Sequence, residues 1–233
     1  MTSLDHVTSI SGTQRLVTDH MTKPLNYVLV DWGTSNARAW LLKDDGSRQN
    51  SRTAPLGIRQ LKNINFHSAL NSLTSGWPVD AQTPVLMSGM IGSRQGWLET
   101  PYLPCPASID DLFAGIQALP NLDNVKITPG VHDGTVAGLN DVMRGEEVQI
   151  FGALAALDDP DAAHLFCLPG THSKWAVVEE GRVVRFATAV TGEAYAAFAD
   201  HTILGALMPN DGQSLVDQAD RQVGFSMGLK RGK

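Results

Sequence analysis

Short apolar runs separated by turn residues dominate the chain after its first two dozen positions. Tyr27 to Val30 is a β-branched run that ends at Asp31-Trp32-Gly33-Thr34-Ser35, and a second apolar run covers Ala37 to Leu42. The Asp-Gly pair within Lys43 to Ser47 favours a tight turn because glycine readily adopts a positive φ. The pattern therefore predicts three strands joined by a Gly-Thr-Ser turn and an Asp-Gly turn.

The same arrangement returns later in the chain. Leu165 to Leu168 is followed by the turn Pro169 to Lys174, by the apolar run Trp175 to Val178 and, after Glu179-Glu180-Gly181, by Val183 to Phe186. In both units the first turn carries a Gly-Thr pair with a serine close behind it. This repeat predicts two similar halves.

Helical periodicity lies between and after these units. Apolar residues at a spacing of about 3.6 predict a helix from Asn140 to about Leu157, with Asn140 as its cap, and a further helix from Thr191 or Gly192 to Leu207. Strands that alternate with helices predict an α/β fold. Residues 1–24 show neither period, so we expect a disordered tail there, with Met21 as an alternative to Met1 for the natural start.

Composition narrows the classes of function. The chain has 24 acidic and 18 basic residues, a net charge of −6, and no block rich in lysine and arginine, which argues against nucleic-acid binding. Its apolar runs are a few residues long, far short of the roughly 20 that a membrane-spanning helix needs. Two cysteines are too few for a disulfide scaffold. We expect a cytoplasmic protein that acts on small molecules.

The two Gly-Thr turns have a chemistry suited to phosphate. Glycine lets a ligand approach the backbone closely, and N–H and hydroxyl groups donate hydrogen bonds to phosphate oxygens. Asp31, at the end of a strand, is placed to bind Mg²⁺. Two purely structural hairpins remain the alternative. The candidate phosphate-binding residues are Gly33, Thr34, Ser35, Gly170, Thr171, His172, Ser173 and Lys174.

Four longer stretches carry a resemblance to a known family. Val30 to Trp40, Ser88 to Trp97, Asp141 to Glu147 and Leu168 to Trp175 resemble the 2-dehydro-3-deoxygalactonokinase family, which belongs to the actin-like, sugar-kinase ATPase superfamily. The resemblance implies a duplicated ribonuclease-H-like fold that binds ATP, Mg²⁺ and a sugar acid in the cleft between its halves. With it, we expect a first domain over residues 25–148 and a second over residues 149–233.

The reaction that the resemblance implies is phosphorylation of the C6 hydroxyl of 2-dehydro-3-deoxy-D-galactonate, in galactonate catabolism. Asp141 is the candidate base that accepts the hydroxyl proton. Arg94 is the candidate receptor for the sugar-acid carboxylate, because a guanidinium matches a carboxylate. The other candidate substrate residues are Gln95, Gly96, Trp97, Arg144, Glu146 and Glu193. For Arg144 and Glu146, ordinary surface ion pairs are the alternative.

The C-terminal part departs from this family pattern. A ribonuclease-H-like half needs further strands after its second hairpin, and the sequence up to Lys233 offers none, so we expect an incomplete second half without an adenosine pocket. Two other functions therefore stay open: a catalytically impaired, truncated remnant that retains the sugar-acid cleft, and a phosphatase or ATPase of the same superfamily. An uncovered sheet edge also favours self-association, so a homodimer is considered.

Overall fold

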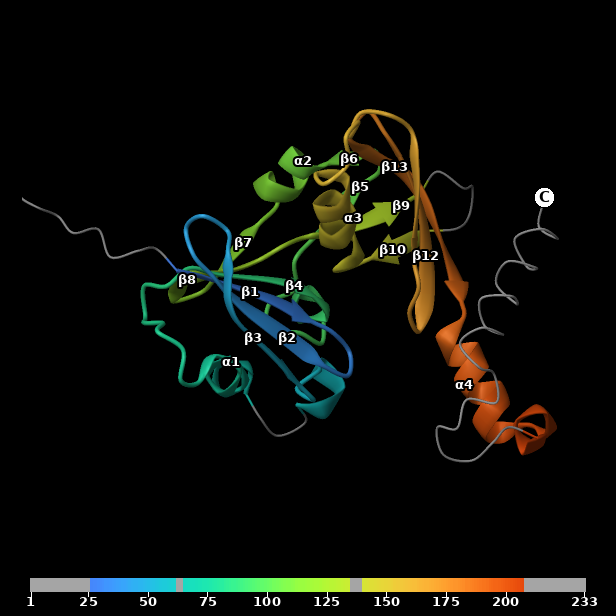
Figure 1. The fold of residues 1–233 in the computed structure, drawn as a ribbon, viewed down its shortest axis with the longest axis horizontal. Helices are drawn as coiled ribbons and strands as arrows, with labels where there is room; N and C mark the ends of the chain where they lie inside the picture. The colour runs from blue at the N-terminus through green and yellow to red at the C-terminus, as the bar shows by residue number, and fades with distance from the viewer. Residues whose placement is uncertain (1–25, 62–64, 135–139, 208–233) are drawn as a thin grey trace, which may run out of the picture.

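The computed structural model describes residues 26–61, 65–134 and 140–207. The expected tail over residues 1–24, the candidate start at Met21 and the chain after Leu207 lie outside the described residues. The described residues form three β-sheets with helices packed against them (Figure 1). This arrangement confirms the expected α/β class.

The first sheet has six strands in the order β3-β2-β1-β4-β8-β7. Its strands are β1 Tyr27–Trp32, β2 Ala37–Leu42, β3 Arg48–Ala54, β4 Val85–Gly89, β7 Gln117–Leu119 and β8 Leu122–Ile127. The first three strands form an antiparallel meander, whereas β4 pairs parallel to both β1 and β8. This is the strand order of a ribonuclease-H-like sheet, and the three predicted strands at its start are confirmed.

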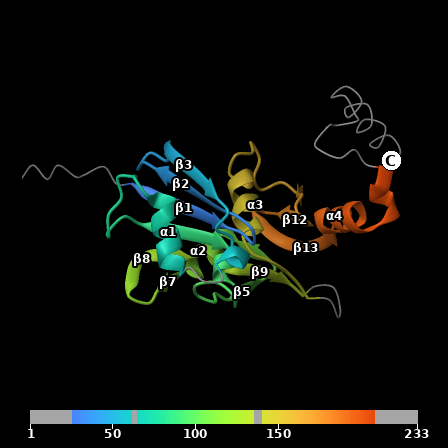
Figure 2. The same ribbon diagram turned by 90° about the horizontal axis from the view of Figure 1, so that it is seen from below.

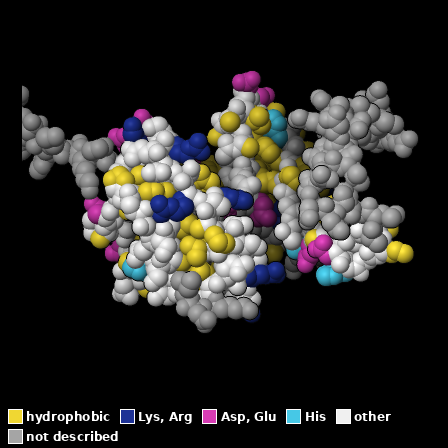
Figure 3. All heavy atoms as spheres, turned by 60° about the horizontal axis from the view of Figure 1, so that its bottom comes forward, with side chains coloured by type: hydrophobic (Ala, Val, Ile, Leu, Met, Phe, Trp, Pro, Cys, Tyr) yellow, Lys and Arg dark blue, Asp and Glu magenta, His cyan; other side chains and the backbone are white. Residues whose placement is uncertain are grey.

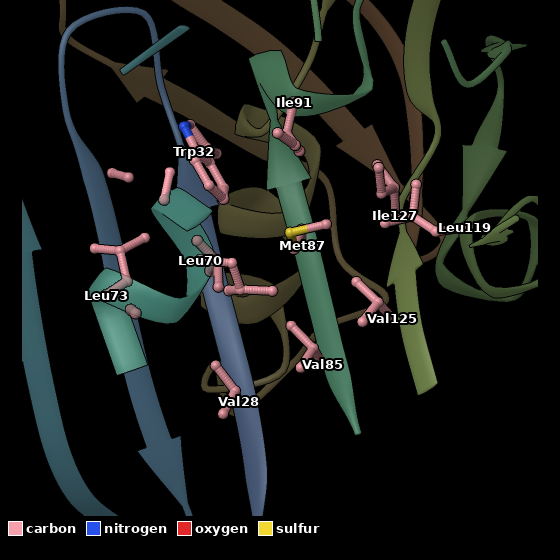
Figure 4. Close-up of a cluster of buried hydrophobic side chains, with 14 of the residues drawn as sticks. Val28, Trp32, Leu70, Leu73, Val85, Met87, Ile91, Leu119, Val125 and Ile127 are labelled. Carbon is pink, nitrogen blue, oxygen red and sulfur yellow. The ribbon is translucent and has the colours of Figure 1, made fainter. Parts of the chain in front are cut away.

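Helix α1, Phe66–Thr74, covers one face of this sheet. Asn65 caps the helix by accepting a hydrogen bond from the Ser68 N–H at 2.7 Å. Every second residue of β1 points to the same face, so Val28, Val30 and Trp32 are buried there with Leu70 and Leu73 of α1 (Figure 4). The short helices η1, Ile58–Gln60, and η2, Met90–Gly92, flank this core.

The second part of the molecule is built from two smaller sheets. One has the order β11-β12-β13-β6 and the other the order β10-β9-β5. Their strands are β5 Tyr102–Pro104, β6 Ala107–Ser108, β9 Gly130–Asp133, β10 Asp141–Met143, β11 His164–Leu168, β12 His172–Glu179 and β13 Arg182–Val190. The predicted second meander is β11-β12-β13, and it is confirmed. Helices α2, Ile109–Ala114, and α3, Glu146–Leu154, accompany these sheets.

A second hydrophobic cluster holds this part together. Ile150, Phe151 and Leu154 of α3 pack with Ala176 of β12 and Met143 of β10. The cluster therefore combines residues from both sides of position 148, and the expected domain division at that position stays a prediction.

The predicted helix from Asn140 to Leu157 is wrong in its first six residues. Asp141–Met143 form strand β10, which pairs antiparallel with β9, and α3 begins only at Glu146. Gly145 stands directly before α3 with φ +109°, whereas residues in an α-helix have a φ of about −63°. The pairing with β9 and the turn at Gly145 therefore prevent a helix over these residues, despite the helical spacing of the apolar positions. The residue before the helix is Gly145, so Asn140 is not the cap.

The last predicted helix is shorter than expected. Helix α4 covers Gly192–His201, Thr202 is extended, and the separate 3₁₀ helix η3 covers Ile203–Leu207. In both ribbon views α4 leads from the end of β13 away from the six-stranded sheet (Figures 1 and 2). Within the described ranges, none of the helices has the length and apolar character needed to span a membrane.

Candidate functional site

A cleft of about 440 Å³ lies between the two parts of the molecule. Acidic and basic side chains meet in the recess between the two lobes (Figure 3). Both Gly-Thr turns reach the cleft, one after β1 and one between β11 and β12. The residues that line it are Asp31, Gly33, Thr34, Gly89, Met90, Tyr102, Val142, Met143, Arg144, Gly145, Glu146, Gln149, Leu168, Pro169, Gly170, Thr171, His172 and Lys174.

The backbone of the first turn is fixed by hydrogen bonds. The Gly33 N–H donates to the Asn36 carbonyl at 2.9 Å, and the carbonyls of Gly33, Thr34 and Ser35 accept bonds from the N–H groups of residues 57–59 at 3.1 Å. A Cβ at Gly57 would lie 2.2 Å from the Ser35 carbonyl carbon, so this close approach requires glycine. Gly33 and Thr34 line the cleft, whereas Ser35 supports the turn without lining it.

The second turn is fixed to the start of α4. The carbonyls of Gly170 and Thr171 accept hydrogen bonds from the N–H groups of Gly192 and Glu193 at 3.2 and 3.0 Å. Ser173 Oγ lies 2.6 Å from Thr191 Oγ1 and is buried outside the cleft lining. The connection therefore holds a turn from one hairpin against the first residues of a helix.

His172 and Glu193 add a side-chain contact to this connection. His172 Nε2 lies 2.7 Å from Glu193 Oε2, and His172 lines the cleft whereas Glu193 does not. In this geometry Glu193 supports the second turn. Its predicted role as a hydroxyl ligand stays a prediction.

Asp31 lies at the end of β1 and faces the cleft beside the first turn. Its Oδ2 is 3.0 Å from Arg38 Nη1. Across the described residues, no group of three or more His, Cys, Asp and Glu side chains could hold a metal ion. Mg²⁺ at phosphate sites is commonly held by one or two carboxylates together with phosphate oxygens, so the single Asp31 carboxylate fits a Mg²⁺ that arrives with a nucleotide.

Asp141 and Lys174 lie together. The buried Lys174 ammonium donates to the Val142 carbonyl and Thr188 Oγ1, both at 2.5 Å, and lies 3.4 Å from Asp141 Oδ1. Asp141 Oδ1 also accepts a hydrogen bond from Thr188 Oγ1 at 2.6 Å. An ammonium has three N–H groups, and all three have acceptors here. The predicted base and the predicted phosphate-binding lysine thus form an ion pair, and Asp141 does not line the cleft.

The turn from Arg144 to Glu147 places the Glu146 carboxyl at the cleft and the Glu147 carboxyl in the protein interior. Glu146 lines the cleft, and its Oε2 accepts a hydrogen bond from the Arg144 N–H at 3.0 Å. The Glu147 side chain is fully buried, and both of its oxygens accept from the Gly145 N–H at 2.8 and 2.7 Å. Burial raises the pKa of the Glu147 carboxyl to about 8. Glu147 belongs to the Asp141 to Glu147 stretch, but it was not among the predicted site residues.

Arg144 is buried, lines the cleft and contacts two residues that were not predicted from the sequence. Its guanidinium hydrogen-bonds to Thr100 and Tyr102, and the Tyr102 ring lies 4.1 Å from its central carbon. Neither Thr100 nor Tyr102 belongs to a recognisable motif, and the fold alone brings them to Arg144.

The predicted substrate residues of the Ser88 to Trp97 stretch are absent from the cleft lining, namely Arg94, Gln95, Gly96 and Trp97. The Arg94 side chain is 88% exposed, with Nε 3.8 Å from Glu99 Oε1. Trp97 stacks on Phe66 with ring centroids 5.9 Å apart, and a Cβ at Gly96 would lie 1.9 Å from the Ile91 carbonyl oxygen. Gly96 and Trp97 thus have packing contacts, and substrate binding by Arg94, Gln95, Gly96 and Trp97 stays a prediction.

Comparisons with known proteins agree with this architecture. The chain is 38% identical over 185 residues to a probable 2-dehydro-3-deoxygalactonokinase of Rhizobium meliloti (strain 1021), covering 79% of this chain and 60% of the relative. It is 36% identical over 209 residues to the 2-dehydro-3-deoxygalactonokinase of Escherichia coli (strain K12), covering 88% of this chain and 65% of that protein.

A solved structure extends the comparison to the fold. The crystal structure of a candidate 2-dehydro-3-deoxygalactonokinase from Sinorhizobium meliloti superposes with a TM-score of 0.71 at 38% identity, over 77% of this chain and 59% of that chain. The chain thus spans about 60% of the length of these relatives. The profile of the 2-keto-3-deoxy-galactonokinase family matches residues 31–233. This chain therefore belongs to the 2-keto-3-deoxy-galactonokinase family.

Proposed function

We propose that this protein transfers a phosphoryl group from MgATP to the C6 hydroxyl of 2-dehydro-3-deoxy-D-galactonate. One observation carries the proposal: two Gly-Thr turns, from separate sheets, line a single cleft together with Asp31 and Glu146. Membership of the family supplies the class of substrate. We also propose a cytoplasmic location, where ATP is available, while a homodimer stays a prediction.

The two turns are proposed to hold the phosphates of ATP from opposite sides of the cleft. Gly33, Thr34, Gly170 and Thr171 line it, and their hydrogen-bonded backbones keep the turns in place before a nucleotide binds. Asp31 is the residue that would hold Mg²⁺. When bound, Mg²⁺ neutralises charge on the phosphate oxygens during transfer.

Two carboxylates compete for the role of general base. The base must reach the substrate hydroxyl, and Glu146 lines the cleft whereas Asp141 does not. Asp141 is also held by Lys174 and Thr188. We therefore place Glu146 first and give Asp141 a supporting role. Glu146 takes the hydroxyl proton while the substrate oxygen bonds to the γ-phosphorus, the bond to the bridging oxygen breaks, and ADP leaves.

Lys174 is proposed to act on the position of the second turn. Its ammonium joins β12, which follows that turn, to β10, which leads to Glu146. The ion pair with Asp141 thus keeps the proposed base and the phosphate turn at a fixed separation. A direct contact of Lys174 with phosphate would require one of its three present acceptors to be released.

A coupled assay of ADP formation with 2-dehydro-3-deoxygalactonate tests the proposal. We expect ADP to form only when both MgATP and the sugar acid are present. Glu146→Gln should lower kcat by about 10²- to 10⁴-fold, the usual contribution of general-base catalysis. Asp141→Asn is the matched variant and should lower kcat by less than about tenfold. The reverse order of the two losses would restore Asp141 as the base, and acid-independent ADP formation would contradict the kinase.

A further inference from the structure

The cleft contains a buried positive charge that no side chain in the described part of the chain balances through an ion pair. Arg144 is 8% exposed, and the ion pairs found among these residues do not include it. A buried charge is costly unless a partner compensates for it. Glu146 contacts the Arg144 backbone N–H rather than the guanidinium. Both carboxyl oxygens of Glu147 accept from the Gly145 N–H, and the ion pairs of the described residues do not join Glu147 to the guanidinium.

The contacts of the guanidinium fix its orientation with neutral acceptors. Nη1 donates to Thr100 Oγ1 at 2.5 Å, Nη2 to the Thr100 carbonyl at 2.8 Å, and Nε to the Tyr102 hydroxyl at 3.3 Å. A guanidinium has five N–H groups, so one on each terminal nitrogen remains for a ligand. The Tyr102 ring supports its face at 4.1 Å. The group is therefore oriented before any ligand binds, which lowers the entropic cost of binding.

The position of this group within the cleft indicates what it binds. Arg144 and Tyr102 line the same cleft as Glu146 and both phosphate turns. Resting on the proposed function, we propose that Arg144 binds the carboxylate of the sugar acid and that Tyr102 and Thr100 position its guanidinium. A ligand carboxylate supplies the missing negative charge and accepts charge-assisted hydrogen bonds. The carboxylate of the sugar acid is then the group by which the cleft distinguishes its substrate from uncharged sugars.

Arg94 is the competing receptor, and the geometry separates the two arginines. Its side chain is 88% exposed and already has Glu99 nearby, at 3.8 Å. Charge pairs in water contribute little because solvent screens them. Arg144 is buried, oriented and in the cleft, so its contact with a carboxylate should contribute far more.

The proposal is tested by calorimetric titration with 2-dehydro-3-deoxygalactonate and with its uncharged methyl ester, in the presence of a non-hydrolysable ATP analogue. We expect the unsubstituted chain to bind the acid about 10- to 100-fold more tightly than the ester, as for a charge-assisted hydrogen bond. Arg144→Gln should reduce this ratio to near one with little effect on ester binding. Arg94→Gln, the matched variant, should keep the ratio.

Further variants keep the test decisive if Arg144→Gln does not fold. Arg144→Lys retains the charge but cannot satisfy Thr100 and a ligand together, so the acid-to-ester ratio should still fall by about tenfold. Thr100→Val leaves the guanidinium in place with one contact fewer, and a smaller fall is expected. Circular dichroism establishes that each variant is folded. A ratio near one before substitution, an unchanged ratio in folded Arg144 variants, or its loss in Arg94→Gln overturns the proposal.

The outcomes also separate this inference from the proposed function. Acid-selective binding that depends on Arg144, without any phosphoryl transfer, would contradict the kinase and support the carboxylate site. Phosphoryl transfer together with an acid-to-ester binding ratio that Arg144→Lys leaves unchanged would support the kinase. The same result would overturn Arg144 as the carboxylate site.

Discussion

Gly145 is the residue on which the local geometry of the proposed base depends. It has φ +109°, and a Cβ there would lie 3.1 Å from Gly89 Cα. We expect Gly145→Ala to lower the free energy of unfolding by about 1–3 kcal/mol through backbone strain, and to lower kcat because Glu146 moves. Denaturant unfolding and the coupled assay measure both effects.

Gly152, inside α3, is the control for this substitution. A Cβ there meets no atom within 4 Å, and alanine favours a helix over glycine by about 1 kcal/mol. Gly152→Ala should therefore stabilise the protein slightly and leave kcat unchanged. Equal effects at the two glycines would show that the conformation of Gly145 is unimportant.

Glu147 should make stability depend on pH. Its folded-state pKa, about 8, exceeds the ordinary value of 4.5, so the folded protein holds this proton more tightly than the unfolded chain does. The resulting stabilisation is complete below about pH 4.5 and is lost as the pH rises through 8, at up to about 1.4 kcal/mol for each pH unit. Arg144 and Glu146 are the charged neighbours that modify the effect.

The measurement is urea unfolding of the unsubstituted protein and of Glu147→Gln between pH 5 and pH 9. As the pH rises, the unsubstituted protein should lose unfolding free energy relative to Glu147→Gln. A difference that stays constant over this range would mean that Glu147 ionises at its ordinary pKa.

At the scale of elements, Lys174 joins β12 to β10 and β13. Lys174→Met leaves Thr188 and Asp141 without the ammonium, and we expect a loss of about 2 kcal/mol in unfolding free energy. In a double-mutant cycle with Asp141→Asn the two losses should not add, because the residues share one interaction. Lys126→Met, at an exposed position of β8, should cost less than about 0.5 kcal/mol. If the two losses add, Lys174 and Asp141 contribute independently to the free energy of unfolding and their ion pair does not stabilise the fold.

The two meanders were predictable because each strand is a short apolar run bounded by turn residues, and these signals are local. The start of α3 was not predictable from spacing. Asp141–Met143 pair with β9, eight to twelve residues earlier in the chain, and Gly145 packs so closely on Gly89 that a Cβ at Gly145 would lie 3.1 Å from the Gly89 Cα. The two Gly-Thr turns were likewise predictable, because their turn residues are adjacent in the sequence. Tyr102 and Thr100 reach Arg144 from more than 40 positions away, so no local pattern marks them.

At the scale of the whole molecule, the two Gly-Thr turns belong to different sheets and line one cleft. A nucleotide that bridges them should therefore stabilise both parts together. At a MgATP concentration 100 times Kd, the free energy of unfolding should rise by about 2.7 kcal/mol. Hydrogen exchange should show protection at residues 31–36 and 169–174 alike, and protection of one turn alone would contradict a shared site.

The most direct test of the central claim is a ³¹P NMR measurement of the products formed from MgATP and 2-dehydro-3-deoxygalactonate. The account predicts equal amounts of ADP and a new phosphomonoester on C6 of the sugar acid, with almost none of either product for Glu146→Gln. Inorganic phosphate in place of the sugar phosphate would instead indicate an ATPase or a phosphatase. That result, or unchanged ATP, would contradict the account.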